Sequence, residues 1–145
     1  MIEIQGTKAV AALQPEVLNN GSGTAVEVDT QGFAYATFFI QTGTMATSSN
    51  ISVCKVQESD TSGSGFADIT SAGLASGDLD ADTDDAVAAI EVDLRGNRER
   101  YLQLVVTESG SANAPISAVC VLSMASELQE PNSASGRGLT ALVQV

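Results

Sequence analysis

The chain contains no histidine and no tryptophan, and only 6 of its 145 residues are lysine or arginine. Without histidine, the Ser-His-Asp and Cys-His nucleophilic systems are excluded, as are the common histidine-based metal sites. Two cysteines are too few for a four-thiolate zinc site, and the glycines form neither a dinucleotide-binding motif nor a P-loop. No catalytic signature is present, so we expect a protein that is not an enzyme and needs no cofactor.

The balance of charge is strongly acidic, with a formal net charge of −12. Nucleic acids and anionic membranes are bound by clustered basic residues, and the only such cluster is Arg95, Arg98 and Arg100. We therefore expect neither nucleic acid nor membrane as a partner, whereas a basic protein surface would suit this chain. The start M-I-E-I-Q lacks the features of a signal peptide, so we expect synthesis in a cytoplasm.

Residues 87–107, V-A-A-I-E-V-D-L-R-G-N-R-E-R-Y-L-Q-L-V-V-T, show the clearest pattern. Apolar side chains recur at every second position in two runs, which is typical of strands with one buried face. Between the runs, Gly96 and Asn97 tolerate the positive φ of a tight reversal, so the pattern predicts a β-hairpin. Its predicted inward-facing residues are Ala88, Ile90, Val92, Leu94, Leu102, Leu104 and Val106.

Similar patterns elsewhere predict an all-β, two-sheet sandwich of jelly-roll type with about 7–8 strands. Residues 33–42 carry three of the four phenylalanines, so we expect this strand at the centre of the core. Residues 8–13 fit either a short helix ended by Pro15 or an extended arm. We divide the chain into an arm (1–23), a sandwich (24–126) and a tail (127–145). The other predicted strands are 24–29, 51–59, 66–69, 115–125 and 139–145, with a long acidic loop over 71–85.

A short internal repeat supports this division. V-D-T-Q-G at residues 28–32 matches V-D-L-R-G at residues 92–96, and a strand with an early tyrosine follows each copy. Each aspartate can accept backbone hydrogen bonds across the turn, as in an Asx-turn. The repeat predicts two similar hairpins.

Cys54 and Cys120 lie in apolar strand-like runs. We favour two buried thiols that act as small hydrophobic side chains over a disulfide between two strands.

The acidic segment D-L-D-A-D-T-D-D offers Asp78, Asp80 and Asp82 as weak candidates for a divalent cation. The match to a calcium loop fails at Thr83, where that loop needs glycine, and at Ala89, where it needs a bidentate glutamate. We therefore predict no metal site and favour a solvated loop that charge repulsion keeps extended.

Two further groups are candidates for contacts. Arg98, Glu99, Arg100 and Tyr101 can bind an anion, but we favour ion pairs with nearby carboxylates such as Asp93 that anchor the turn. The apolar chain ends can add strands to neighbouring subunits. We therefore predict partner or oligomer contacts at six residues of these ends: Ile2, Ile4, Leu139, Leu142, Val143 and Val145.

The order of four stretches resembles the head decoration, or cement, proteins of tailed bacteriophages. The resemblance covers roughly residues 24–125 and consists of strand and turn patterns rather than a catalytic motif. The stretches are V-D-T-Q-G-F-A-Y-A-T-F-F-I, V-Q-E-S-D-T-S-G-S-G-F-A-D-I, V-D-L-R-G-N-R-E-R-Y-L-Q-L-V-V-T and I-S-A-V-C-V-L-S.

The resemblance implies a structural virion protein, often a homotrimer, that sits outside the capsid where major capsid protein subunits meet. It implies that the protein stabilises the phage head and is located on the exterior of the virion. The alternative is a tail or baseplate β-sandwich that adheres to a host glycan or protein, which requires exposed aromatics. Only Phe33, Tyr35 and Tyr101 suit that role. A hydrolase that uses paired carboxylates ranks last.

Overall fold

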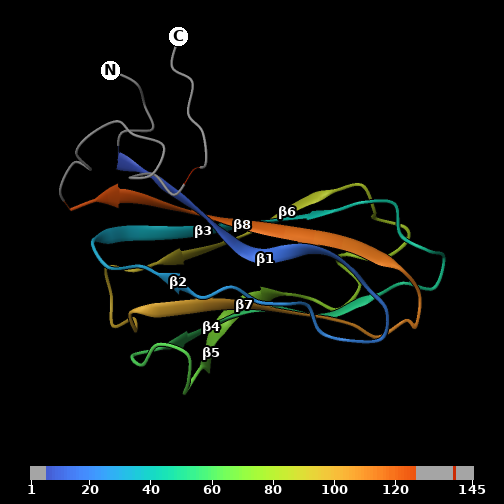
Figure 1. The fold of residues 1–145 in the computed structure, drawn as a ribbon, viewed down its shortest axis with the longest axis horizontal. Helices are drawn as coiled ribbons and strands as arrows, with labels where there is room; N and C mark the ends of the chain where they lie inside the picture. Colours follow the sequence, from blue (N-terminus) through green and yellow to red (C-terminus); the bar gives the residue numbers. More distant parts are fainter. Residues whose placement is uncertain (1–5, 127–138, 140–145) are drawn as a thin grey trace, which may run out of the picture.

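The computed structural model describes residues 6–126 and residue 139. Strands within residues 8–125 form two packed antiparallel sheets (Figure 1). Within these residues no helix is long and apolar enough to cross a membrane. The eight strands are β1 (Lys8–Leu18), β2 (Val28–Asp29), β3 (Phe33–Thr42), β4 (Ile51–Ser59), β5 (Ala67–Leu74), β6 (Val87–Asp93), β7 (Tyr101–Glu108) and β8 (Ala114–Ala125).

The strand order is β1-β8-β3-β6 in one sheet, which we call sheet A, and β2-β7-β4-β5 in the other, sheet B. All neighbouring strands run antiparallel. Consecutive strands lie in opposite sheets, with β4 and β5 as the exception, and β8 returns beside β1 as β7 returns beside β2. This is the double Greek-key order of a jelly roll, so the predicted fold class is confirmed.

A single apolar core fills the space between the sheets. Because side chains alternate along a strand, each strand sends every second residue into it. Phe38 and Ile40 of β3, Val56 of β4, Leu104 of β7 and Leu122 of β8 are all fully buried. Strand β3 lies between β8 and β6, which places the phenylalanine-rich strand in the interior of sheet A as predicted.

The predicted hairpin over residues 87–107 is wrong. Strand β6 pairs with β3 in sheet A, whereas β7 pairs with β2 and β4 in sheet B, so residues 94–100 cross from one sheet to the other. Two-residue periodicity correctly identified the inward faces of both strands, but it carries no information about the partner of a strand. Neither Gly96 nor Asn97 has the positive φ that a tight hairpin needs, because the chain crosses between the sheets here instead of reversing.

The repeat at residues 28–32 and 92–96 marks two such crossings, not two hairpins. Strand β2 is in sheet B and β3 in sheet A, so the first copy also passes between sheets. The predicted Asx-turns are present: Asp29 accepts a hydrogen bond from the Gln31 N–H at 3.1 Å, and Asp93 accepts one from the Arg95 N–H at 3.0 Å. A turn with the same local chemistry therefore serves both sheet-to-sheet connections.

The proposed boundary at residue 23 places one strand on the wrong side. Residues 8–18 form β1, which pairs with β8 along its length, so the helix alternative for residues 8–13 is wrong. The predicted strand over 24–29 is reduced to β2, with Ala25 in an isolated bridge to Leu13. Strand β5 extends to Leu74, which shortens the predicted acidic loop.

The two cysteines are free and buried, in β4 of sheet B and β8 of sheet A. The favoured prediction of buried thiols is confirmed, and the disulfide alternative is wrong. Burial raises the pKa of both thiols to about 12.

Candidate binding surface

The acidic loop after β5 is a series of turns held by its own carboxylates. Asp78 accepts a hydrogen bond from the Ala75 N–H at 2.8 Å, and Asp80 accepts one from the Asp82 N–H at 2.9 Å. Within the described residues no group of three or more acidic, cysteine or histidine side chains is placed to hold a metal ion. The weak candidates Asp78, Asp80 and Asp82 therefore do not converge on one point.

The same loop is anchored rather than extended by repulsion. Leu79 is only 3% exposed and packs in the core, and its carbonyl accepts a hydrogen bond from the Ile51 N–H at 3.0 Å. Asp84 accepts a hydrogen bond from the Met45 N–H at 2.7 Å. The carboxylates of this loop therefore satisfy backbone donors and fix the fold of the connection.

The arginine cluster is used for ion pairs at the sheet crossings, as predicted. Arg100 pairs with Asp29 at 2.7 Å, and this hydrogen bond lowers the pKa of the Asp29 carboxyl. Arg95 pairs with Asp93 at 2.7 Å, and its side chain and backbone lower the pKa of that carboxyl to about 2. Arg98 contacts Glu58 of β4 at 3.2 Å. Three carboxylates thus neutralise the cluster, which leaves little charge for an external anion.

The aromatic groove required by the glycan alternative is partly blocked by this cluster. The guanidinium of Arg95 lies 4.7 Å from the centre of the Tyr35 ring, and that of Arg100 lies 5.0 Å from the centre of the Tyr101 ring. A cation over an aromatic ring occupies the face on which a sugar stacks. Phe33 lines a separate hollow of about 310 Å³ beside Arg98 and Arg100.

A buried glutamate that sequence reasoning missed holds one end of the sandwich together. Glu108 is 1% exposed, and its carboxylate accepts hydrogen bonds from the N–H groups of Asn20 and Gly110, each at 2.5 Å, and of Asn50 at 3.3 Å. Burial alone would raise the pKa of Glu108, but these backbone donors lower it overall. The sequence did indicate that Glu108 is buried, because residue 108 continues the alternation that places Leu104 and Val106 in the core.

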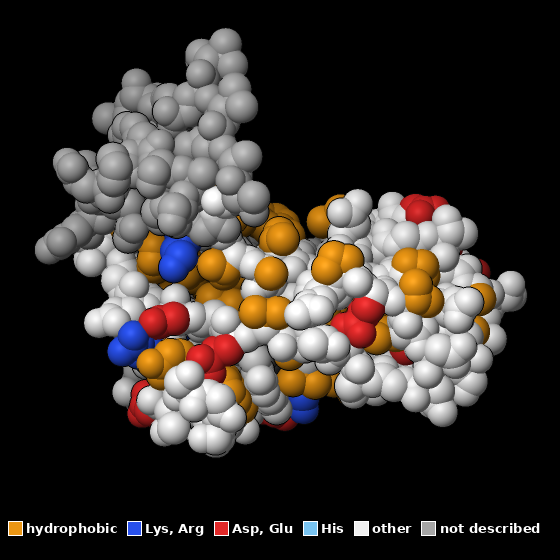
Figure 2. Space-filling model, in the orientation of Figure 1, with side chains coloured by type: hydrophobic (Ala, Val, Ile, Leu, Met, Phe, Trp, Pro, Cys, Tyr) orange, Lys and Arg blue, Asp and Glu red, His pale blue; other side chains and the backbone are white. Residues whose placement is uncertain are grey.

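The outward face of sheet A is unusually apolar. All five large hydrophobic side chains that are exposed in the described residues lie on its strands, and none lies on sheet B: Val17, Phe39, Val87, Val119 and Met124. Four of them are in the outward phase, whereas Met124, near the end of β8, continues the phase of the buried Cys120 and Leu122. Figure 2 shows hydrophobic side chains in a band across the upper layer, where β1 and β8 lie. The sequence signal was an apolar residue in the outward phase, as in the adjacent pair Phe38 and Phe39.

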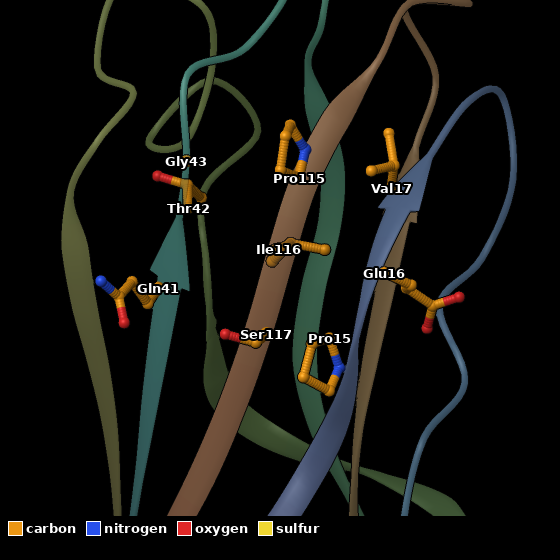
Figure 3. A pocket seen from close by; sticks show the side chains of 9 residues that line it. All are labelled: Pro15, Glu16, Val17, Gln41, Thr42, Gly43, Pro115, Ile116 and Ser117. Carbon is orange, nitrogen blue, oxygen red and sulfur yellow. The ribbon is translucent and has the colours of Figure 1, made fainter.

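A groove of about 430 Å³ opens on the same face (Figure 3). Pro15 and Val17 of β1 form one wall, Gln41 of β3 lies on the other side, and Pro115 and Ser117 of β8 lie between them. The small side chain of Ser117 leaves this space open. Glu16 also lines the groove, but its carboxylate points away from it and accepts a hydrogen bond from the Thr24 N–H.

The predicted terminal contacts are largely outside the described residues. Ile2, Ile4, Leu142, Val143 and Val145 lie there, as does most of the predicted strand over 139–145. Leu139 is described as partly buried and is not assigned to a strand.

Comparison with known proteins shows no family to which this chain belongs. No protein-family model and no curated protein sequence matches this chain. Among solved structures, the Eiger TNF from S. frugiperda is similar with a TM-score of 0.36 and 8% sequence identity. The match covers 88% of this chain and 99% of the other.

Proposed function

We propose that this protein is a structural virion protein that binds the outside of a tailed-bacteriophage capsid and stabilises the head. The observation that carries the proposal is the resemblance over residues 24–125. Its quoted stretches cover β2, most of β3, β7 and β8, parts of β4, β5 and β6, and both aspartate turns between the sheets. The resemblance therefore rests on strands and turns of the sandwich other than β1.

The physical demands of that role fit the described residues. A cement protein adds contact area between shell subunits and needs no bond-breaking step. Its partners are the major capsid protein and further copies of itself, as a homotrimer at three-fold positions on the virion exterior. Three-fold repetition strengthens a weak contact, because each engaged subunit raises the effective concentration of the next. The acidic turns of residues 78–85 keep a densely coated particle soluble.

The test is binding to heads. Purified protein is mixed with undecorated, expanded heads of the phage that encodes it, and the particles are imaged and heated. We expect density at the three-fold positions and a higher disruption temperature than for undecorated heads. A small acidic protein of similar net charge serves as the control for non-specific adsorption. Heads that remain bare would reject the proposal.

A further inference from the structure

The outward face of sheet A contains a continuous row of apolar side chains. Ala11 of β1 is registered with Val119 of β8, Val119 with Phe39 of β3, and Phe39 with Ala89 of β6. The row crosses all four strands. Val119 is 49% exposed and Phe39 is 40% exposed, although both belong to central strands of the sheet. We call this row, with the groove around Ser117 beside it, the apolar face of sheet A.

Three of the four strands present no charged side chain in this outward phase. Their outward residues are apolar or neutral, and charges appear only on β6, as Glu91 and as Asp93 paired with Arg95. The outward face of sheet B differs, because it carries the ion pair between Lys55 and Asp68. The neutral outward residues on β1, β3 and β8 include Ala9, Ala11, Tyr35, Thr37, Phe39, Gln41, Ser117, Val119, Val121 and Ser123.

We propose that the apolar face of sheet A packs against a second copy of this chain. Each copy has a net charge of −12, so a contact between copies is favourable only where like charges are not brought together. The apolar face meets that condition. A capsid surface differs from a second copy in this respect, because it can compensate acidic groups with basic ones and does not require a neutral face.

The size of the face is sufficient for a stable contact. Four strands spaced ~4.8 Å apart, with ~10 residues each at a rise of ~3.3 Å, cover roughly 600 Å². Two such faces together provide roughly 1,200 Å², which is at the lower end of the ~1,200–2,000 Å² that standard protein interfaces bury in total. The inference deepens the proposed function, since it rests on the self-association proposed there and identifies this face as one of the two surfaces that each subunit of a trimer uses.

The first test introduces the same charge on each sheet. Val119→Glu places a carboxylate at the centre of the apolar face, and Val105→Glu places one on the outward side of β7 in sheet B, opposite Lys55. Sedimentation velocity over a range of concentrations measures self-association of the full chain. We expect Val119→Glu to weaken it at least tenfold and Val105→Glu to leave it within twofold of the unmodified protein. A monomeric unmodified protein, or equal behaviour of the two variants, would overturn the inference.

A milder pair of variants covers the case in which Val119→Glu fails to fold. Val119→Cys and Val105→Cys keep the side-chain volume similar, and the two native thiols are buried. Under associating conditions we expect a maleimide to label Val119→Cys at least ten times more slowly than Val105→Cys. Equal labelling rates at full association would contradict a shared interface at this face.

Head binding separates this inference from the proposed function. If Val119→Glu self-associates like the unmodified protein but no longer binds heads, the face docks on the shell. That result would overturn the inference but not the proposed function. If Val119→Glu no longer self-associates and the unmodified protein does not bind heads, the inference is supported and the proposed function is rejected. If Val119→Cys is a monomer and its thiol is still labelled slowly, the chain's own terminal residues cover the face. That result would also overturn the inference.

Discussion

The carboxylate of Glu108 accepts a hydrogen bond from the backbone N–H of Asn20, 88 residues earlier in the chain. The same carboxylate also binds the N–H groups of Asn50 and Gly110. One buried charge therefore joins the loop after β1, the loop before β4 and the loop after β7. These loops lie at one end of the sandwich, and the Glu108 side chain helps to fix their arrangement together with backbone hydrogen bonds such as that from the Glu108 N–H to the Gly21 carbonyl.

Replacing Glu108 with glutamine should destabilise the fold. The amide keeps the side-chain volume but loses the charge, and its NH₂ group cannot accept from the backbone donors. Hydrogen bonds to a charged group are each worth about 1.5–3 kcal/mol, so we expect the free energy of unfolding to fall by ~2 kcal/mol or more. Urea denaturation measures the change. Glu91→Gln, at an exposed position on β6, is the matched control and should leave the midpoint nearly unchanged.

Protonation of the Glu108 carboxylate should also make the stability of the fold depend on pH. The pKa of Glu108 is lowered from its ordinary value of 4.5, so its contribution is present above pH 4.5 and is lost as pH falls through the lower, folded-state pKa. Asp29 and Asp93 act in the same direction from their ordinary value of 3.8, Asp93 towards about 2. We expect thermal stability to fall between pH 4.5 and pH 2, and to fall less steeply in Glu108→Gln. Parallel curves for the two proteins would contradict this assignment.

Two glycines in connecting segments should respond differently to alanine. A Cβ at Gly110 would lie 1.7 Å from the Ser48 carbonyl oxygen, a distance that forces the backbone apart. A Cβ at Gly96 would meet nothing within 4 Å. We therefore expect Gly110→Ala to lower the melting temperature by at least ~5 °C, since about 1 kcal/mol corresponds to several degrees in a domain of this size. Gly96→Ala should be neutral or slightly stabilising, because alanine restricts the unfolded chain. Equal melting temperatures would show that the loops at Ser48 and Gly110 adjust freely.

Sequence patterns located most strands but not their partners. The predicted bounds of β3 and β4 match the structure, because alternation and flanking turns define where a strand begins and ends. The connection 94–100 was misread because a turn with an adjacent glycine and asparagine can form a crossing between sheets as well as a hairpin. Strand β1 was ambiguous because its small side chains suit both helix and strand. Pairing in a jelly roll joins residues far apart in the chain, such as Ala11 and Val119, and no local pattern encodes it.

The candidate surface was harder to predict for a related reason. An outward apolar residue such as Phe39 looks like a core residue in the sequence, where it sits beside the buried Phe38. Only the register between β3 and β8 shows that Phe39 and Val119 lie together on the outside. Glu108 was missed for the opposite reason, since a charged residue in the inward phase resembles the end of a strand.

The cysteines provide a test of the core that does not depend on function. Cys54 and Cys120 are 4% and 0% exposed, and burial raises the pKa of both thiols to about 12. At pH 8 the native protein should therefore resist a thiol reagent, because the reactive thiolate is rare and the sulfur is covered. In 6 M guanidinium both thiols should react, and intact mass spectrometry should count two labels. Rapid labelling of one native cysteine would place it at the surface, and the absence of labels after denaturation without reductant would indicate a disulfide instead.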